Sequence, residues 1–287
     1  MVVRGPVVKL SNGAEMPLVG LGTWLSEPDV VKNAVRHALD NGYRLIDTAE
    51  LYKNEAEIGE ALAEYLKDGK VKREEIFVTT KLWCTHFAPN EMEPALRESL
   101  KKLQLDYVDL YLAHMPGAFN GMEELYKKGL TKAIGVSNFS AQQVERVVKA
   151  ATVPVHNLQV ECHLYFPQFE LHETCKRHNI SFTAYAPIGS PGRDKFRLPT
   201  GEAIPWKPAK NPMEDPLVTK MASEHQKTPA QILLRYLLQR DIAIIPKSVN
   251  EKRIKENFDI FDFKLSDDEM KELNTQEHHQ RIFFQDL

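Results

Sequence analysis

Four side chains in the amino-terminal half of the sequence could together donate a proton to a carbonyl oxygen: Asp47, Tyr52, Lys81 and His114. Tyrosine has an ordinary pKa near ~10, so it is a poor acid at neutral pH unless a cation stabilises the phenolate. Lys81 could supply that cation, Asp47 could orient the lysine, and His114 could support the donor. A purely structural salt bridge is the alternative interpretation of Asp47 and Lys81 taken alone.

The segments that would position these side chains are short apolar runs that alternate with longer amphipathic stretches. We expect eight strands, at residues 18–22, 44–48, 76–81, 108–114, 132–137, 156–160, 181–186 and 242–247. Several runs are apolar almost throughout, which is typical of parallel strands buried on both faces. Because strand and helix signals alternate through the whole chain, residues 1–287 are predicted to form a single α/β domain.

The intervening stretches carry signals of helix starts, in which a capping side chain precedes an acidic or amide residue by three positions. Such pairs are Asn54 and Glu57, Asn90 and Glu93, Ser140 and Gln143, and Ser266 and Glu269, while Thr228 precedes a proline at the first helical position. Before the first strand, an apolar stretch followed by Asn12 and Gly13 predicts a hairpin with a type I′ turn.

Eight strands that each lead into a helix or loop predict a (β/α)8 TIM barrel preceded by an N-terminal β-hairpin. The alternative is an open doubly wound sheet, but a count of eight strands favours the barrel over it. In a barrel, catalytic groups lie at the carboxyl ends of the strands. All eight predicted ends carry polar or aromatic side chains: Thr23 and Trp24, Asp47, Lys81, His114, Ser137 and Asn138, Gln159, Tyr185, and Lys247 and Ser248.

One segment interrupts the alternation of strands and helices. Residues 190–216 contain six prolines and few apolar clusters. Such long irregular connections are uncommon in compact domains and often cover an active site. The position of this segment, after the seventh predicted strand, favours a lid over an idle surface insertion.

Composition and charge exclude several classes of protein. With 37 basic and 40 acidic residues the net charge is −3, so a strongly basic nucleic-acid-binding protein is excluded. The chain has no apolar run of the ~18 residues that a transmembrane helix needs, and its first residues lack the apolar core of a signal peptide. The three cysteines show no metal-site spacing, so we expect no metal and a reducing, cytoplasmic location.

Five blocks of the sequence resemble the signature blocks of the aldo-keto reductases, most closely those of the aldose and aldehyde reductase branch. They lie at residues 47–52, 81–83, 109–114, 135–139 and 245–248. The resemblance extends from about Val7 to Leu287, in order and with no block missing. It implies the same barrel fold that the strand pattern predicts.

The resemblance also implies roles for the residues at the strand ends. Tyr52 matches the general acid, and Asp47, Lys81 and His114 match the residues that support it. A reduced nicotinamide would supply the hydride. The residues that would bind this half of the cofactor are Thr23, Trp24, Asp47, Ser137, Asn138, Gln159, Tyr185 and Ser190, with Tyr185 beneath the nicotinamide ring.

Charge indicates where the other half of the cofactor would bind. Asn250 is predicted to cap a short helix that begins near Glu251, and Lys252, Arg253 and Lys255 lie in its first two turns. Each cation near the N-terminus interacts unfavourably with the helix dipole, which destabilises the helix by roughly 0.3–1 kcal/mol. A bound anion would offset this unfavourable interaction.

The resemblance assigns that anion to the 2′-phosphate of the cofactor. Lys247, Ser248 and Arg253 match the phosphate site, and Glu256 and Asn257 match residues near adenine. Arginine and lysine together suit a phosphate, so NADPH is expected rather than NADH. A solvated basic turn is the alternative interpretation.

The sequence departs from the branch near the substrate. Relatives usually carry a longer loop after the position of Pro116 and a longer C-terminal tail, and position 115 is often Trp where this chain has Met115. Trp24, Trp83, His114 and Met115 would line an apolar substrate pocket, unless they only pack the core. We expect the shortened loop and tail to leave an open site with broad and weak substrate selection.

The sequence therefore predicts an NADP-dependent oxidoreductase that reduces aldehydes, and also ketones or reducing sugars, to alcohols. A non-catalytic NADPH-binding barrel protein is the alternative function. A barrel hydrolase is disfavoured because no pair of catalytic carboxylates is evident. The expected partner is a small carbonyl compound, and the resemblance suggests a monomer.

Overall fold

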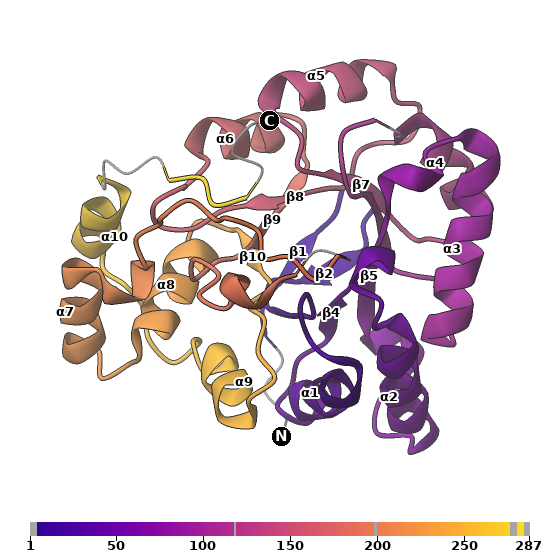
Figure 1. The fold of residues 1–287 in the computed structure, drawn as a ribbon. Helices are drawn as coiled ribbons and strands as arrows, with labels where there is room; N and C mark the ends of the chain where they lie inside the picture. Colours follow the sequence, from indigo (N-terminus) through magenta and orange to yellow (C-terminus); the bar gives the residue numbers. More distant parts are fainter. Residues whose placement is uncertain (1–4, 118, 198–199, 276–279, 284–287) are drawn as a thin grey trace.

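The computed structural model describes residues 5–117, 119–197, 200–275 and 280–283, and its centre is a barrel of parallel strands (Figure 1). Each strand overlaps one predicted apolar run, so the (β/α)8 TIM barrel is confirmed. In spatial order the strands are β3 (Gly20–Gly22), β4 (Leu45–Asp47), β5 (Phe77–Leu82), β6 (Leu110–Ala113), β7 (Ile134–Ser137), β8 (Asn157–Glu161), β9 (Ser181–Tyr185) and β10 (Ala243–Ile244).

Two isolated bridges close the barrel between β3 and β10. Val19 pairs with Ile244, and Gly22 pairs with Lys247, both in parallel. A Cβ atom at Gly22 would lie 2.5 Å from the carbonyl oxygen of Ile245, so glycine is the residue that allows this close approach. The sheet is consequently a ring, and the open doubly wound alternative is wrong.

The helices surround the barrel and connect its strands (Figure 1). They are α1 (Pro28–Asp40), α2 (Glu55–Lys67), α3 (Pro89–Leu103), α4 (Phe119–Lys127), α5 (Ala141–Ala150), α6 (Phe169–Arg177), α7 (Pro216–Glu224), α8 (Pro229–Leu238), α9 (Glu251–Phe258) and α10 (Asp267–Asn274). Ser140, Thr228 and Ser266 form the predicted capping boxes at α5, α8 and α10. These local signals therefore predicted the starts of three helices correctly.

One predicted cap is at the wrong position, and another lies at the capping position without making a capping bond. α3 begins at Pro89 with Ala88 at the capping position, so Asn90 lies inside the first turn. Proline fits the first helical position because its missing N–H group would have no partner there. Asn54 does precede α2, but its side chain makes no bond to that helix and instead contacts loops at the end of the barrel.

The predicted hairpin is present, with β1 (Val7–Lys9) paired antiparallel to β2 (Glu15–Pro17). Its turn differs from the expected type. The Gly13 N–H donates to the Leu10 carbonyl oxygen at 2.8 Å, which places Ser11 and Asn12 at the centre of the turn. The type I′ turn centred on Asn12 and Gly13 is therefore wrong by one position.

Residues 190–216, which we call the lid segment, follow β9 at the carboxyl end of the barrel. The described part contains the short 3-10 helices η4 (Arg193–Lys195) and η5 (Pro212–Glu214) and an isolated bridge between Arg197 and Ala203 before α7 begins. Its first residue, Ser190, has φ 48° and accepts a hydrogen bond from the Arg193 N–H at 3.2 Å. The Trp206 indole donates to the Arg193 carbonyl oxygen at 3.2 Å, so the segment is folded on itself.

Candidate active site

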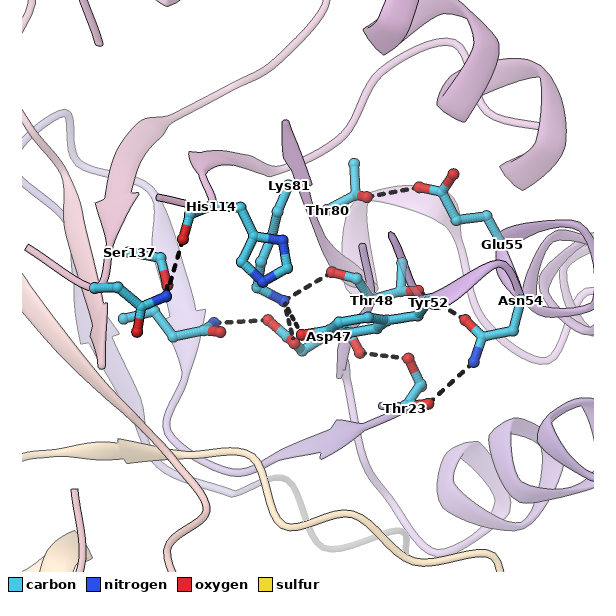
Figure 2. A network of polar contacts seen from close by, with 12 residues as sticks. Thr23, Asp47, Thr48, Tyr52, Asn54, Glu55, Thr80, Lys81, His114 and Ser137 are labelled. Atoms are coloured by element: carbon cyan, nitrogen blue, oxygen red, sulfur yellow. Dashed lines mark hydrogen bonds and ion pairs between the residues drawn. The ribbon is translucent and has the colours of Figure 1, made fainter. Parts of the chain in front are cut away.

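A buried ion pair joins the ends of β4 and β5 (Figure 2). Lys81 Nζ donates to Asp47 Oδ1 at 2.6 Å and to the Thr48 carbonyl oxygen at 2.8 Å. The two charged side chains are only 1% and 3% exposed. Burial lowers the pKa of Lys81 and raises that of Asp47, and the contact between the two charges opposes both shifts. The expected contact between Asp47 and Lys81 is present.

Tyr52 brings its hydroxyl to the same lysine from the short 3-10 helix η1 (Glu50–Tyr52). Lys81 Nζ donates to the Tyr52 hydroxyl at 3.3 Å. Burial, and then the charge of Asp47, raise the pKa of Tyr52 well above its usual value. The phenol therefore stays protonated at neutral pH, as a proton donor must. The Lys81 ammonium is placed to stabilise the phenolate that proton donation would leave.

His114 directly follows β6 and lies in the same cluster as Lys81 and Tyr52 (Figure 2). Its ring centroid is 5.8 Å from that of Tyr52 and 5.2 Å from that of Trp83, both in edge-to-face contact. Burial, and then the charge of Lys81, lower the pKa of His114 well below its usual value. The imidazole is therefore neutral at neutral pH, and it can donate a hydrogen bond without becoming a competing acid.

A second hydrogen-bonded group continues from this cluster across the ends of β7, β8 and β9: Ser137, Asn138, Gln159 and Tyr185. Asn138 has φ 63°, its Nδ2 donates to the His114 carbonyl oxygen at 2.9 Å, and its Oδ1 accepts from the Tyr185 hydroxyl at 2.8 Å. Gln159 Nε2 donates to Asp47 Oδ2 at 2.7 Å. The side chains that the sequence assigned to the nicotinamide therefore lie together, beside the Asp47–Lys81 pair.

Asn54 connects three segments beside the candidate catalytic cluster (Figure 2). Its Nδ2 donates to the carbonyl oxygens of Thr23 and Ser26, and its Oδ1 accepts from the Thr48 hydroxyl at 3.1 Å. The Thr23 hydroxyl in turn donates to the Asp47 carbonyl oxygen at 2.9 Å. Asn54 is fully buried, which could not be predicted from the sequence because asparagine before a helix usually indicates a cap.

We expect replacement of Asn54 with leucine to lower both stability and turnover. The substitution leaves two buried carbonyl oxygens and one hydroxyl without their partner, and each unsatisfied group costs about 1–3 kcal/mol. Urea denaturation should show a loss of about 2–5 kcal/mol in the free energy of unfolding. Asn90→Leu, on the exposed first turn of α3, is the matched control. Equal effects of the two substitutions would contradict the role assigned to Asn54.

An aromatic group lies at the carboxyl end of the barrel: Trp24, Tyr185, Phe196, Trp206 and Phe283. The Phe283 ring centroid is 5.5 Å from Trp24, 5.7 Å from Tyr185 and 5.5 Å from Trp206. The Phe196 ring lies 5.6 Å from Trp24. The sequence identified Trp24 and Tyr185 as site residues but missed the other three. Two of these lie in the lid segment, where aromatic side chains among prolines were the available signal.

A buried carboxylate holds residues 280–283 against the barrel. Glu161 ends β8, and its two oxygens accept from the N–H groups of Ile282 at 2.6 Å and Phe283 at 2.8 Å. The Gln280 side chain bonds in both directions with the Lys210 backbone, at 2.7 and 2.9 Å. The position of Phe283 is therefore set by β8 on one side and by the lid segment on the other.

The residues predicted for the phosphate and adenine half of a cofactor lie in α9 and just before it: Lys247, Ser248, Arg253, Glu256 and Asn257. Asn250 Oδ1 accepts from the Arg253 N–H at 3.0 Å, which confirms the predicted cap. Ser248 Oγ accepts from the Asn250 N–H at 3.1 Å, so the chain just before the helix is also ordered by side-chain bonds.

Two further predicted pocket residues border the same cluster. Trp83 packs against His114, and Met115 Sδ lies 3.7 Å from Asn138 Nδ2. Farther out, a cavity of about 560 Å³ lies between α3, α4 and α5, beside the short connection that follows Met115. Phe87 and Val147 are among its lining residues, which include none of the four catalytic candidates. The predicted open substrate site therefore stays a prediction.

In the part of the chain that the structure describes, no group of three or more His, Cys, Asp or Glu side chains is arranged to hold a metal ion. No helix there is long and apolar enough to cross a membrane. All three cysteines are free thiols.

Comparisons with known proteins agree with this geometry. The model of the aldo/keto reductase family matches residues 18–277. The chain is 45% identical to chicken (Gallus gallus) aldo-keto reductase family 1 member A1 over 297 residues, which covers 93% of this chain and 88% of the chicken protein. The human (Homo sapiens) protein of the same name is 44% identical, with the same coverage.

Two solved structures superpose on nearly the whole chain. The aldose reductase of Schistosoma japonicum has a TM-score of 0.86 and 41% identity, with 97% of this chain and 94% of that one covered. An aldo-keto reductase of the silkworm Bombyx mori, solved in complex with NADP, has a TM-score of 0.86 and 38% identity, with 97% and 95% covered.

Proposed function

The chain belongs to the aldo/keto reductase family and is an NADP-dependent oxidoreductase, and from this premise we propose that it reduces aldehydes to alcohols with Tyr52 as the general acid. The observation that carries the proposal is the contact between Lys81 Nζ and the Tyr52 hydroxyl, 3.3 Å apart in a buried cluster. A protonated phenol with a cation at its oxygen is what proton donation to a carbonyl oxygen requires.

In this reaction Tyr52 and the residues around it transfer one proton to the substrate. The substrate carbonyl oxygen accepts hydrogen bonds from the Tyr52 hydroxyl and from neutral His114. As negative charge develops on that oxygen, Tyr52 transfers its proton to it. Lys81 stabilises the phenolate that remains, and Asp47 holds the lysine in place through the 2.6 Å contact. The phenolate charge appears only once proton transfer has begun. Lys81 therefore stabilises the transition state more than the ground state, which lowers the activation barrier of the reduction.

The nicotinamide of NADPH supplies the hydride, and the chain offers suitable groups to hold it. A carboxamide needs both a donor and an acceptor. Gln159 Nε2 donates to Asp47, and this bond leaves Gln159 Oε1 free to accept a hydrogen bond from the carboxamide. Ser137 and Asn138 add polar groups beside it. Tyr185 supplies an aromatic face, fixed by its bond to Asn138. Thr23, Trp24 and Ser190 complete this half of the site.

Cofactor selectivity is assigned to the cations around α9, so Arg253→Ala should weaken NADPH binding far more than NADH binding. A charge-assisted hydrogen bond to phosphate contributes about 1.5–3 kcal/mol, which corresponds to roughly a 10- to 150-fold change in KM. Steady-state kinetics with both cofactors tests this. Lys255→Ala, on the same helix, is the control. An equal rise of KM for NADPH and NADH would contradict the assignment of Arg253 to the 2′-phosphate.

The proposed substrates are simple aldehydes, together with ketones or reducing sugars. Trp24, Trp83, His114 and Met115 form the pocket in which they bind, and the short connection after Met115 favours broad selection. A cytoplasmic monomer is the proposed form of the protein. A steep preference for one bulky substrate, measured as kcat/KM over a panel of carbonyl compounds, would contradict broad selection.

The decisive experiment measures NADPH consumption with a panel of aldehydes and NADPH binding on the same samples. Turnover together with binding supports the reductase. Binding without turnover would support the alternative, a non-catalytic NADPH-binding barrel protein. Failure to bind NADPH would contradict the assignment of Lys247, Ser248, Arg253, Glu256 and Asn257.

A further inference from the structure

Three cations from three separate segments of the chain gather where the lid segment meets the barrel. Lys247 follows β10, Arg253 lies in the first turn of α9, and Lys195 ends η4 in the lid segment. The charges of Lys195 and Arg253 both act on Lys247. The sequence assigned Lys247 and Arg253 to a phosphate, but it gave Lys195 no role.

Backbone and ring contacts independently bring the segments that carry Lys195 and Lys247 to the same end of β3. Gly22, the last residue of β3, forms a bridge with Lys247. Two residues later, the Trp24 ring packs against Phe196, with their centroids 5.6 Å apart. Since Phe196 directly follows Lys195, this contact holds the end of η4 near the end of β3. Lys247 pairs with Gly22 at that same end of β3.

No carboxylate in the part of the chain that the structure describes forms an ion pair with these three cations. The charged groups of Lys195, Lys247 and Arg253 make no hydrogen bond there, although the Arg253 backbone N–H bonds to Asn250. Other cations nearby do have partners, such as Lys252, which lies 3.7 Å from Glu256. Burial first, and then the charges of Lys195 and Arg253, lower the pKa of Lys247, and the charge of Glu27 only partly opposes this.

Like charges brought together without a counter-ion are unfavourable, and a bound anion would make the same arrangement favourable. Two of the three members already belong to the proposed 2′-phosphate site. The third, Lys195, is carried by η4, which the Trp24–Phe196 contact holds at the same end of β3.

We propose that Lys195 is a further phosphate-binding residue, which joins Lys247 and Arg253 around the 2′-phosphate of NADPH and contributes to the selection of NADPH over NADH. This proposal rests on the proposed function, which supplies the phosphate. It adds a specificity-determining residue from the lid segment to a site otherwise built from β10 and α9.

The test compares the binding of NADPH and NADH to the parent protein and to three variants, by calorimetry and by intrinsic tryptophan fluorescence. Lys195→Gln removes the charge, and Lys195→Arg keeps it. Lys210→Gln removes an exposed cation from elsewhere in the lid segment. We expect Lys195→Gln to raise the Kd for NADPH about tenfold and that for NADH less than about twofold, because loss of one phosphate contact is worth about a factor of ten. Lys195→Arg and Lys210→Gln should bind both cofactors as the parent does.

The outcomes separate this proposal from the proposed function. Unchanged NADPH affinity in Lys195→Gln, with normal binding by the parent, would overturn the role of Lys195 and leave the reductase intact. Equal weakening of NADPH and NADH would also overturn it, because the contact would then involve a group common to both. Absence of NADPH binding by the parent would instead overturn the proposed function. Lys195 is exposed, so thermal melting should confirm that all variants are folded.

Discussion

Tyr52→Phe is expected to reduce kcat by about 10²–10⁴-fold while NADPH binding stays within about twofold of the parent value. The substitution removes one oxygen and keeps the ring, so the edge-to-face contact with His114 and the shape of the cluster are retained. What is lost is the proton that the developing alkoxide must receive, together with the group whose phenolate Lys81 would stabilise. Aldehyde reduction under saturating cofactor and calorimetric titration of NADPH measure the two quantities separately.

A matched control distinguishes loss of the acid from loss of any tyrosine hydroxyl. Tyr65→Phe on α2 removes a hydroxyl that bonds to Asp40, far from the cluster, and should leave kcat unchanged. Retention of near-parent turnover by Tyr52→Phe would show that another group protonates the substrate. His114, whose pKa is held low by burial and by Lys81, would be a poor replacement because it carries no surplus proton at neutral pH.

Lys81→Met is expected to cost both activity and stability. Methionine fills much of the same space but leaves the Asp47 carboxylate buried without its cation. Breaking a buried pair by removing one partner costs about 3–5 kcal/mol, which urea denaturation can measure. The kcat should also fall by about 10²-fold or more, because the Tyr52 phenolate would form without a cation at its oxygen.

The double variant Asp47→Asn with Lys81→Met separates these two effects. It removes the unpaired charge, so much of the lost stability should return, whereas activity should stay low. The asparagine side chain can still accept the bond from Gln159 that Asp47 Oδ2 accepts in the parent. Recovery of activity together with stability would mean that Lys81 acts only through folding, and it would contradict its part in proton transfer.

The strands of the barrel could be predicted because their residues are apolar on both faces, a pattern that few other structures share. The contact between Asp47 and Lys81 followed from the same pattern, since parallel neighbouring strands place their carboxyl ends side by side. Capping boxes such as that of Ser140 could be predicted because each uses residues only three positions apart. These features depend on local sequence or on the fold as a whole.

What could not be predicted depends on contacts between distant segments. Asn54 has the sequence context of a helix cap, yet its side chain bonds to Thr23 and Thr48, because the barrel brings their loops within reach. Phe283 lies next to Trp24 because Glu161 binds its backbone N–H and because Gln280 bonds to the lid segment. No spacing or periodicity in the sequence encodes either contact, so a three-dimensional structure was needed to find them.

Closure of the barrel also has a consequence for how fast the chain folds. The bridges of Val19 with Ile244 and of Gly22 with Lys247 join opposite ends of the chain, and pairings of such long sequence separation form slowly. Because Lys247 is held next to β3 by its bridge to Gly22, the proposed phosphate site cannot exist before the ring is complete. Recovery of NADPH binding during refolding should therefore lag behind recovery of helical circular dichroism, and excess NADPH should slow unfolding by stabilising the closed ring.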